Sequence, residues 1–215
     1  MNRIERTIEF VKNTLEGAEA GHDWFHIERV HRNALYLARK IPCDREVVEL
    51  AALLHDIADP KFHDGDETLS ISRSKKHMER IQVDGGVIER VLYIIQHMSF
   101  KNHMESGVKR NAELDIVQDA DRLDAIGAIG IARTFNFGGF KNNPLYDPSI
   151  KPMVNYSKEE YKKSKGTTIN HFYEKLLLLK DLMNTEEAKR IAEERHLFME
   201  EFLAQFMKEW DGPKD

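Results

Sequence analysis

Apolar residues recur every three or four positions along most of the chain, which is the spacing of one face of an α-helix. Ile4, Ile8, Val11 and Leu15 show this spacing near the N-terminus, and Gly17 is placed to end that helix. The same periodicity predicts further helices over residues 23–41, 44–57, 67–81, 85–97, 112–135, 167–183 and 185–210. No stretch alternates apolar and polar residues well enough to predict a strand. The pattern therefore favours an all-α fold.

One long stretch, residues 137–166, lacks this periodicity and is rich in Gly, Pro, Asn and Tyr. A loop of that length inside a compact domain is usually functional or mobile. Its residues Tyr146, Tyr156 and Tyr161 could stack on a nucleotide base, but ordinary aromatic residues in a polar loop explain them equally well. Since no linker or repeat divides the chain, we expect one domain over residues 1–215 with an irregular insertion at 137–166.

Composition excludes several classes of protein. Hydrophobic residues make up 41% of the chain and charged residues 32%, the balance of a folded rather than a disordered protein. A formal net charge of −5 argues against broad binding of nucleic-acid phosphates. No segment approaches the roughly 20 apolar residues that span a bilayer, and the N-terminus lacks the apolar core of a signal peptide. The single cysteine, Cys43, cannot form an intramolecular disulfide, so we expect a reducing, cytoplasmic location.

The helical pattern ends in ionisable groups at "LLHDIAD", residues 53–59. His55 and Asp56 follow the apolar run "ELAALL", which should bury its helix on most sides and draw the pair inward. A lone His-Asp pair at a helix end is usually just a solvated polar terminus. A buried carboxylate, in contrast, needs a charged partner, hydrogen bonds or a metal ion.

Two other segments carry comparable residues. In "HDWFHIERV", residues 22–30, Asp23 is explained as a helix N-cap, whereas His26 lies at the edge of the inward-facing stripe. Taken alone, His26 would more often be a core histidine than a ligand. In residues 116–132, Asp121 is expected to face inward, and Asp119 and Asp124 are expected to reach solvent.

Together, His26, His55, Asp56 and Asp121 offer two imidazoles and two carboxylates, a mixed nitrogen and oxygen set that suits one divalent transition metal ion. Structural zinc sites instead favour thiolates. Four protein ligands on a metal that prefers six leave positions for water and substrate. We expect Mn²⁺ first and Fe²⁺, Co²⁺ or Ni²⁺ next, with Mg²⁺ less suited because it prefers oxygen ligands.

The order H…HD…D on successive helices resembles the HD-domain metal-dependent phosphohydrolases, in particular the bacterial nucleoside triphosphate pyrophosphohydrolases of similar size. The segments "ALLHDIAD", "IIQHMSF" and "DADRLDAIGAIGIARTF", with the C-terminal helical sequence, extend the resemblance over most of the chain. It implies a single HD-type helical bundle with a metal-site core at about 20–135 and C-terminal helices at about 167–210 packed on it. It also implies metal ligation by the residues matching His26, His55, Asp56 and Asp121.

Other roles follow from position and from this resemblance. Asp59 is placed to deprotonate the attacking water; a helix-end carboxylate beside Pro60 is the alternative, and the resemblance favours catalysis. Phosphoryl transfer also needs cationic or donor groups near the phosphate oxygens. The candidates for substrate binding are Arg29, Lys61 and His97, although His97 could equally be a buried histidine that caps carbonyl groups.

The number of metal ions depends on two further histidines. Some HD proteins hold a second metal through two histidines between the His-Asp pair and the final aspartate, an interval that here contains His77 and His97. His77 lies in "SRSKKHMER", a charged segment that we expect to be solvated. We therefore predict one metal ion.

The expected activity is hydrolysis of a (deoxy)nucleoside triphosphate to the monophosphate and pyrophosphate, as the resemblance implies. A nucleotide phosphomonoesterase or a guanosine-alarmone hydrolase could use the same metal site. A non-catalytic nucleotide-binding HD regulatory module is the alternative from another class, and the intact ligand set speaks against it. The expected partner is a small phosphorylated substrate, a nucleotide, rather than nucleic acid or a membrane. The base, the sugar and the oligomeric state, a homodimer included, stay open.

Overall fold

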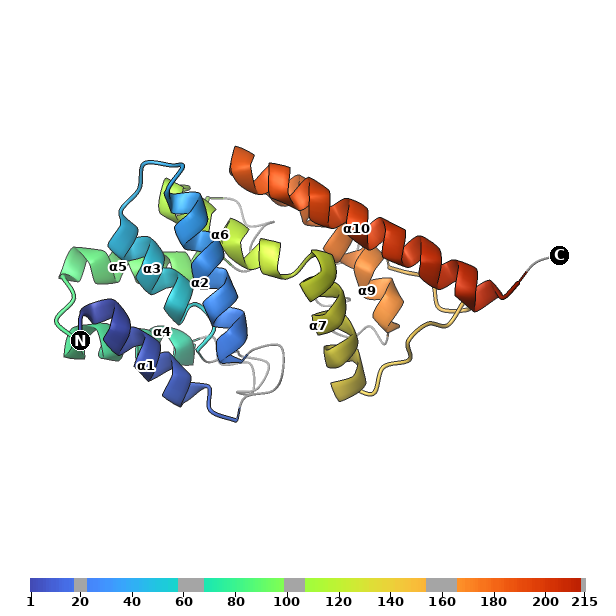
Figure 1. Cartoon of the computed structure of the whole chain (residues 1–215). Coiled ribbons are helices and arrows are strands. Elements are labelled where there is room, and N and C mark those ends of the chain that lie inside the picture. Colours follow the sequence, from blue (N-terminus) through green and yellow to red (C-terminus); the bar gives the residue numbers. More distant parts are fainter. Residues whose placement is uncertain (18–22, 58–67, 99–106, 154–165, 214–215) are drawn as a thin grey trace. The chain divides into compact units, whose positions relative to one another are not determined.

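The computed structural model describes residues 1–17, 23–57, 68–98, 107–153 and 166–213. Helices joined by turns and extended connections make up these ranges, and no strand occurs among them. The chain divides into two compact units, residues 1–121 and 122–215 (Figure 1). The prediction of an all-α fold is confirmed. That the two units form one domain stays a prediction.

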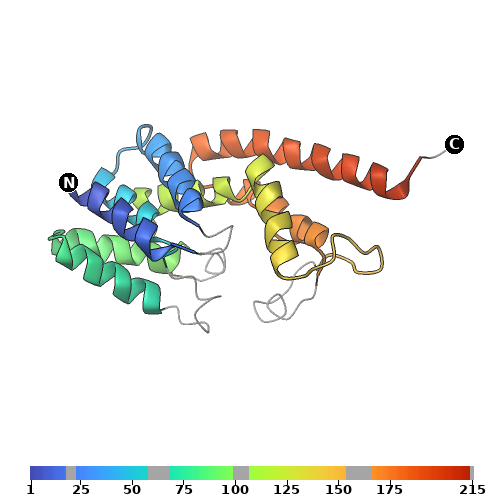
Figure 2. The same ribbon diagram turned by 60° about the horizontal axis from the view of Figure 1, so that its bottom comes forward.

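The first unit is arranged around one central helix, α3 (Arg45–Leu54), which packs against three others. These are α1 (Arg3–Thr14), α2 (Trp24–Ala38) and α5 (Gly85–His97), and α4 (Thr68–Arg80) packs on α5 (Figures 1 and 2). Seven of the ten α3 residues are buried: Val47, Val48, Leu50, Ala51, Ala52, Leu53 and Leu54. Because α3 is enclosed on most sides, the residues that directly follow it start from the interior of the unit.

Aspartate side chains cap the start of three helices in this unit. Asp23, Asp44 and Asp84 each accept a hydrogen bond from a backbone N–H in the first turn of α2, α3 and α5. Such caps contribute about 1 kcal/mol each, since they satisfy donors that the helix itself leaves open. The prediction that Asp23 is an N-cap is therefore confirmed.

The second unit contains α7 (Gly127–Phe140), α9 (Thr168–Glu174) and α10 (Glu186–Asp211), with two short 3₁₀ turns, η3 (Leu176–Leu178) and η4 (Lys180–Leu182). Helix α7 packs against α9 and α10. The rings of Phe135, Phe172 and Phe202 meet at centroid distances of 5.8–6.1 Å, and Phe172 is fully buried. Aromatic packing thus contributes to the core of this unit.

Three helix boundaries differ from the periodicity. The single helix predicted over 112–135 is wrong: α6 (Ala112–Asp124) ends before Gly127, which adopts a positive φ of 75°, and α7 begins there. Helix α7 also continues to Phe140, past the predicted start of the irregular stretch at 137. The helix predicted over 167–183 is α-helical only in α9 and then tightens into η3 and η4. Periodicity detects an apolar face but not such a change of backbone direction.

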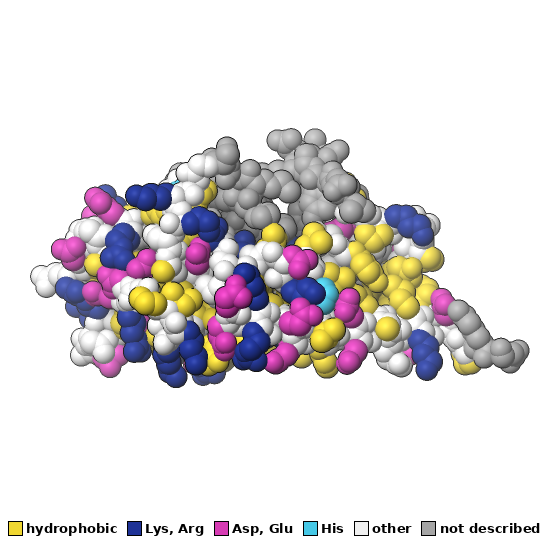
Figure 3. Space-filling model, turned by 90° about the horizontal axis from the view of Figure 1, so that it is seen from above, with side chains coloured by type: hydrophobic (Ala, Val, Ile, Leu, Met, Phe, Trp, Pro, Cys, Tyr) yellow, Lys and Arg dark blue, Asp and Glu magenta, His cyan; other side chains and the backbone are white. Residues whose placement is uncertain are grey.

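Charged side chains of both signs are intermixed on the surface. Along α10, Lys189 pairs with Glu186, and Arg190 pairs with Glu187 and Glu194. The face seen in Figure 3 likewise shows Lys and Arg side chains interspersed with Asp and Glu. In the part of the chain that the structure describes, every helix is too short or too polar to cross a membrane.

Candidate metal centre

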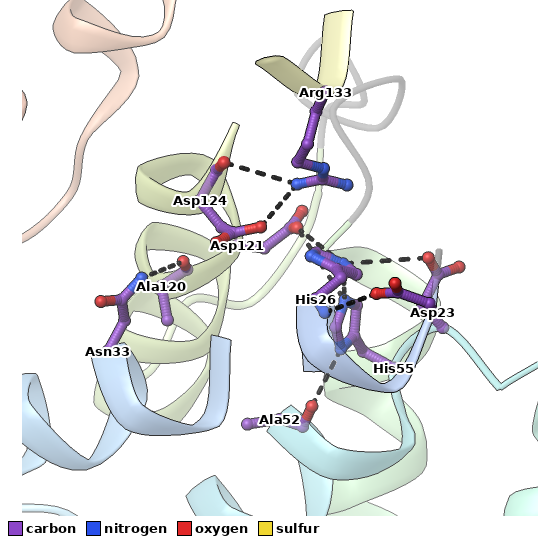
Figure 4. Close-up of polar contacts among 10 residues, drawn as sticks. Asp23, His26, Asn33, Ala52, His55, Ala120, Asp121, Asp124 and Arg133 are labelled. Carbon is purple, nitrogen blue, oxygen red and sulfur yellow. Dashed lines mark hydrogen bonds and ion pairs between the residues drawn. The ribbon is translucent and has the colours of Figure 1, made fainter. Parts of the chain in front are cut away.

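His26 enters the site from the first turn of α2. The Asp23 carboxylate accepts a hydrogen bond from the His26 backbone N–H at 3.0 Å, so the N-cap fixes the turn that carries this histidine (Figure 4). The His26 residue is only 2% exposed. Its position on the inward edge of α2, which the hydrophobic stripe predicted, therefore holds in the folded unit.

His55 and Asp56 follow the last residue of α3. The Nδ1 atom of His55 lies 2.9 Å from the Ala52 carbonyl oxygen, one turn back along the chain. A carbonyl can only accept, so Nδ1 carries the proton and Nε2 keeps a lone pair. A histidine held in this way is oriented to bind a cation through Nε2.

The four predicted ligands converge in unit 1. The Nε2 atoms of His26 and His55 lie 3.3 Å apart. The Oδ1 atom of Asp121 lies 3.7 Å from the His26 nitrogen and 3.9 Å from the His55 nitrogen (Figure 4). Asp56 Oδ2 lies 3.9 Å from His26 Nε2. Ligand atoms of His26, His55 and Asp56 all lie within 4.8 Å of one another.

These separations fit one shared ion. Two atoms that each bind the same ion at about 2.1 Å cannot be more than about 4.2 Å apart. The distances from His26 to the other three residues, and from His55 to Asp121, are all shorter than this limit. Two carboxylates beside two close imidazole nitrogens also concentrate negative charge and lone pairs, which a divalent cation compensates.

Exposure differs between the two kinds of ligand. The imidazole side chains of His26 and His55 are 2% and 6% exposed, whereas the Asp56 and Asp121 carboxylates are 19% and 37% exposed. The histidines thus form the buried floor of the site, and the carboxylates lie toward solvent. Among the four described residues, the carboxylates are thus the more accessible to solvent.

The expected orientation of the three aspartates of α6 is only partly right. Asp119 is fully buried and Asp124 is 2% exposed, so the prediction that they reach solvent is wrong. Asp124 is compensated within unit 2 by an ion pair with Arg133 at 2.6 Å. Asp121 does meet the histidines, but its side chain stays partly exposed. Flanking apolar residues did not reveal how α6 is rotated about its axis.

The other four predicted site residues are Asp59, Lys61, Arg29 and His97. Asp59 and Lys61 lie outside the described residues. Arg29 lies on α2 one turn after His26, and His97 ends α5, where its Nδ1 donates to the Tyr93 carbonyl at 2.7 Å. His97 also stacks on the Tyr93 ring at 4.2 Å. Its role toward a substrate stays a prediction.

His77 lies in a different environment from the one expected. It is 3% exposed and faces α1, with Nε2 bonded to Thr7 Oγ1 at 3.0 Å and Nδ1 facing Arg80 at 3.4 Å. The expectation of a solvated His77 is therefore wrong. Both ring nitrogens already have partners, so His77 is not available to a second metal ion without breaking these bonds.

One contact near the site was not foreseen. The side-chain amide of Asn33 donates to the Ala120 carbonyl at 3.2 Å and joins α2 to α6 next to Asp121 (Figure 4). Asn33 follows His26 by two helical turns and so lies on the same face of α2. The spacing could have indicated that Asn33 faces the same side as His26. It could not have indicated the partner, because the Ala120 carbonyl is a backbone group.

Comparison with known proteins agrees with this arrangement. The model of the HD domain family matches residues 24–126, which include all four converging residues. The YpgQ protein of Bacillus subtilis is 38% identical over 213 residues, which cover 99% of this chain and 96% of YpgQ. A crystal structure of YpgQ in complex with ADP has a TM-score of 0.74 and covers 98% of both chains.

Two further crystal structures are similar along nearly the whole chain. A protein from Lactobacillus plantarum is 36% identical, with a TM-score of 0.88 and 98% of both chains covered. An HD-superfamily hydrolase from Bacillus thuringiensis is 46% identical, with a TM-score of 0.75 and coverage of 98% of this chain and 97% of its own. The similarity therefore extends beyond the matched domain to the C-terminal helices.

Proposed function

The chain belongs to the HD-domain family, and from this membership and the geometry of its four converging residues we propose a metal-dependent phosphohydrolase that acts on nucleoside triphosphates. The products would be a nucleoside monophosphate and pyrophosphate. The observation that carries the proposal is the pair of buried Nε2 atoms 3.3 Å apart, with an oxygen of each carboxylate within 3.9 Å of His26 Nε2. Buried groups of this kind without a cation would be costly.

We assign His26, His55, Asp56 and Asp121 as ligands of one divalent ion, with Mn²⁺ as the first candidate. When bound, such an ion polarises a phosphoryl oxygen and makes a water molecule more acidic. The Ala52 carbonyl keeps the His55 ring in the tautomer that ligation requires. Two histidines among the ligands make Mg²⁺ less suited.

Asp59, three residues after Asp56, is proposed as the general base. Its carboxylate would accept the proton of the attacking water, whose oxygen forms a bond with the α-phosphorus. The bond between the α-phosphorus and the bridging oxygen breaks, and pyrophosphate leaves with that oxygen. Arg29, Lys61 and His97 are proposed to bind the phosphate oxygens, because a triphosphate brings about four negative charges to an acidic protein.

The ligand of one relative, YpgQ, supports a nucleotide as the substrate class. YpgQ was crystallised with ADP, and its similarity to this chain covers both units. ADP contains the base, the sugar and two of the three phosphates of a nucleoside triphosphate. It therefore supports a nucleotide site without defining which phosphate bond is cleaved.

Metal analysis of the purified protein, followed by a nucleotide panel with phosphate and pyrophosphate measured separately, tests the proposal. Pyrophosphate release that needs an added or retained divalent ion is the expected result. Turnover that persists after chelation would contradict the metal dependence. Specific nucleotide binding without turnover, whichever ion is supplied, would identify a regulatory module instead.

Labelled water tests the bond that is cleaved. Hydrolysis in ¹⁸O-water should place the label in the nucleoside monophosphate, because water attacks the α-phosphorus. Label found only in inorganic phosphate would show attack at a terminal phosphate, as in a phosphomonoesterase. Label in the pyrophosphate would also exclude attack at the α position.

Substitutions separate the proposed roles. Asp59→Asn should keep the metal ion and lose rate by about 10²–10⁴-fold, as expected when a general base is removed. Arg29→Ala and Lys61→Ala should lower kcat/KM without changing metal content. If Asp59→Asn turned over at the normal rate, Asp59 would be only a carboxylate at a helix end.

A further inference from the structure

A surface cavity of about 390 Å³ lies on unit 1 between α1 and the end of α4. Its lining includes the side chains of Arg6, Glu9, Phe10, Arg80 and Ile81. None of these is a candidate metal ligand or a residue of the proposed reaction. The volume is within the range of about 300–1,000 Å³ that small-molecule sites occupy.

Two guanidinium groups in this cavity, those of Arg6 and Arg80, have no carboxylate partner within the described ranges of the chain. Among the residues that the structure describes, no ion pair joins Arg6 or Arg80 to an acidic side chain. Several other arginines of the unit are paired with carboxylates, as Arg90 is with Asp44 and Glu113 at 2.8 Å. Glu9 also lines the cavity but forms no ion pair with either arginine, so positive charge remains in excess.

His77 fixes the position of one of these arginines. Thr7 Oγ1 donates to the Arg3 carbonyl at 2.9 Å, so its oxygen must accept from His77 Nε2, 3.0 Å away. The proton is therefore on Nε2, and Nδ1 is left as an acceptor for Arg80 Nη2 at 3.4 Å. Thr7 thus orients the His77 ring, and His77 in turn orients the Arg80 guanidinium.

The same histidine leaves the charge of Arg80 intact. The His77 ring is buried and stacks on Phe10 at a centroid distance of 4.0 Å. Burial, and then the charges of Arg80 and Arg6, lower the pKa of His77 to about 4. A neutral imidazole accepts a hydrogen bond from Arg80 without cancelling its positive charge. A carboxylate in the same place would accept the bond and also cancel the charge.

We propose that this cavity is a second binding site, specific for a phosphate group on a small organic molecule, with Arg6 and Arg80 as the phosphate ligands. Guanidinium forks match the oxygens of a phosphate in charge and geometry, and several of the Arg80 N–H donors remain for a ligand. Phe10 and Ile81 supply an apolar wall for the organic part. Inorganic phosphate would satisfy the arginines alone, whereas a nucleoside monophosphate would use the wall as well.

Nuclear magnetic resonance of the full-length, chelator-treated protein tests this site separately from the metal centre. Inorganic phosphate and adenosine monophosphate are added over about 1–50 mM at constant ionic strength and pH 7.5, and the His77 ring nitrogens are followed. Saturable shifts are expected with both probes, with tighter binding of adenosine monophosphate. If the two probes bind with equal affinity, the anion site is still supported, but the apolar wall has no role in binding.

Matched arginine variants make the result specific. Arg6→Ala and Arg80→Ala should each weaken binding roughly tenfold or more, because each removes a charge-assisted hydrogen bond. Arg73→Ala removes an exposed arginine of the same helix that does not line the cavity, and should change affinity by less than about twofold. If Arg80→Ala fails to fold, Arg6→Ala alone decides.

Absence of saturable shifts over this range, or equal weakening in Arg73→Ala, would overturn the proposal. Equal shifts with chloride in place of phosphate would do the same, because they would show general screening. The outcome does not depend on the proposed activity. If the protein is inactive but phosphate still shifts the His77 ring nitrogens, the second site is supported. If the protein is active but phosphate causes no such shift, the second site is refuted.

Discussion

The Nε2 atoms of His26 and His55 lie 3.3 Å apart although the residues are 29 positions apart in the chain. Each ring reaches this point from a helix end, His26 from the first turn of α2 and His55 from just after α3. The two helices pack closely along their lengths, so the distance between these nitrogens follows from the helix packing. Pre-organised nitrogens allow an ion to bind with little further loss of entropy.

Asp56→Ala should abolish metal retention. It removes one carboxylate from a four-residue set and leaves the imidazoles with less negative charge nearby. We expect metal affinity to fall by at least about 100-fold, measured by elemental analysis after gel filtration and by metal titration. Glu89→Ala, which removes an exposed acidic residue of α5, is the control and should retain the metal. An Asp56→Ala protein with normal metal content and activity would refute the centre.

Asn33→Leu should weaken metal binding without unfolding the protein. The substitution keeps the branching and the number of side-chain heavy atoms but removes the donor to the carbonyl of Ala120, the residue before Asp121. Because α6 would then be held less firmly against α2, we expect roughly tenfold lower metal affinity, at the low end for groups that position ligands. Arg32→Ala, an exposed neighbour on α2, should leave the affinity unchanged. Equal affinities for the wild type and Asn33→Leu would show that the bond has no positioning role.

His77 should make the stability of the protein depend on pH between about 6.5 and about 4. Its folded pKa of about 4 lies below the unfolded value of 6.5, so the unfolded chain binds the proton more readily in this window. Its contribution is fully present above pH 6.5 and is lost as pH falls through that window, by up to about 3 kcal/mol.

Urea unfolding of metal-free protein at several pH values measures this effect. His77→Gln cannot titrate, so the free energy of unfolding should fall less steeply toward pH 4 than in the wild type. The comparison isolates His77 from the carboxylates that also titrate in this range. Identical pH profiles for both proteins would contradict the assignment.

Gly130→Ala should destabilise the second unit. A Cβ atom at Gly130 would lie 2.2 Å from the Ala125 carbonyl oxygen, which is backbone and cannot move aside easily. We expect a loss of about 1–3 kcal/mol, the usual range for overpacking. Gly139→Ala on the same helix meets nothing within 4 Å and should be neutral or gain up to about 1 kcal/mol from helix propensity. Thermal unfolding of the two variants gives the comparison.

The sequence alone was sufficient for the helical class, the position of most helices and the identity of the four converging residues. Helix faces are encoded locally, because burial of one face needs apolar residues at a spacing of three or four. Asp23, Asp44 and Asp84 are also local signals, since a cap bonds to the turn beside it. His55 and Asp56 could be assigned to the interior because most of the α3 residues before them are apolar.

Only the tertiary structure decided how those helices turn their polar residues toward one another. Helix α6 carries Asp119, Asp121 and Asp124 within one six-residue stretch. The rotation of the helix about its axis decides which of them meets His26. The break at Gly127 depended on a backbone conformation, and the burial of His77 on a partner in α1 that is 70 positions away. Such features are set by contacts between distant segments, which a periodicity within one segment does not contain.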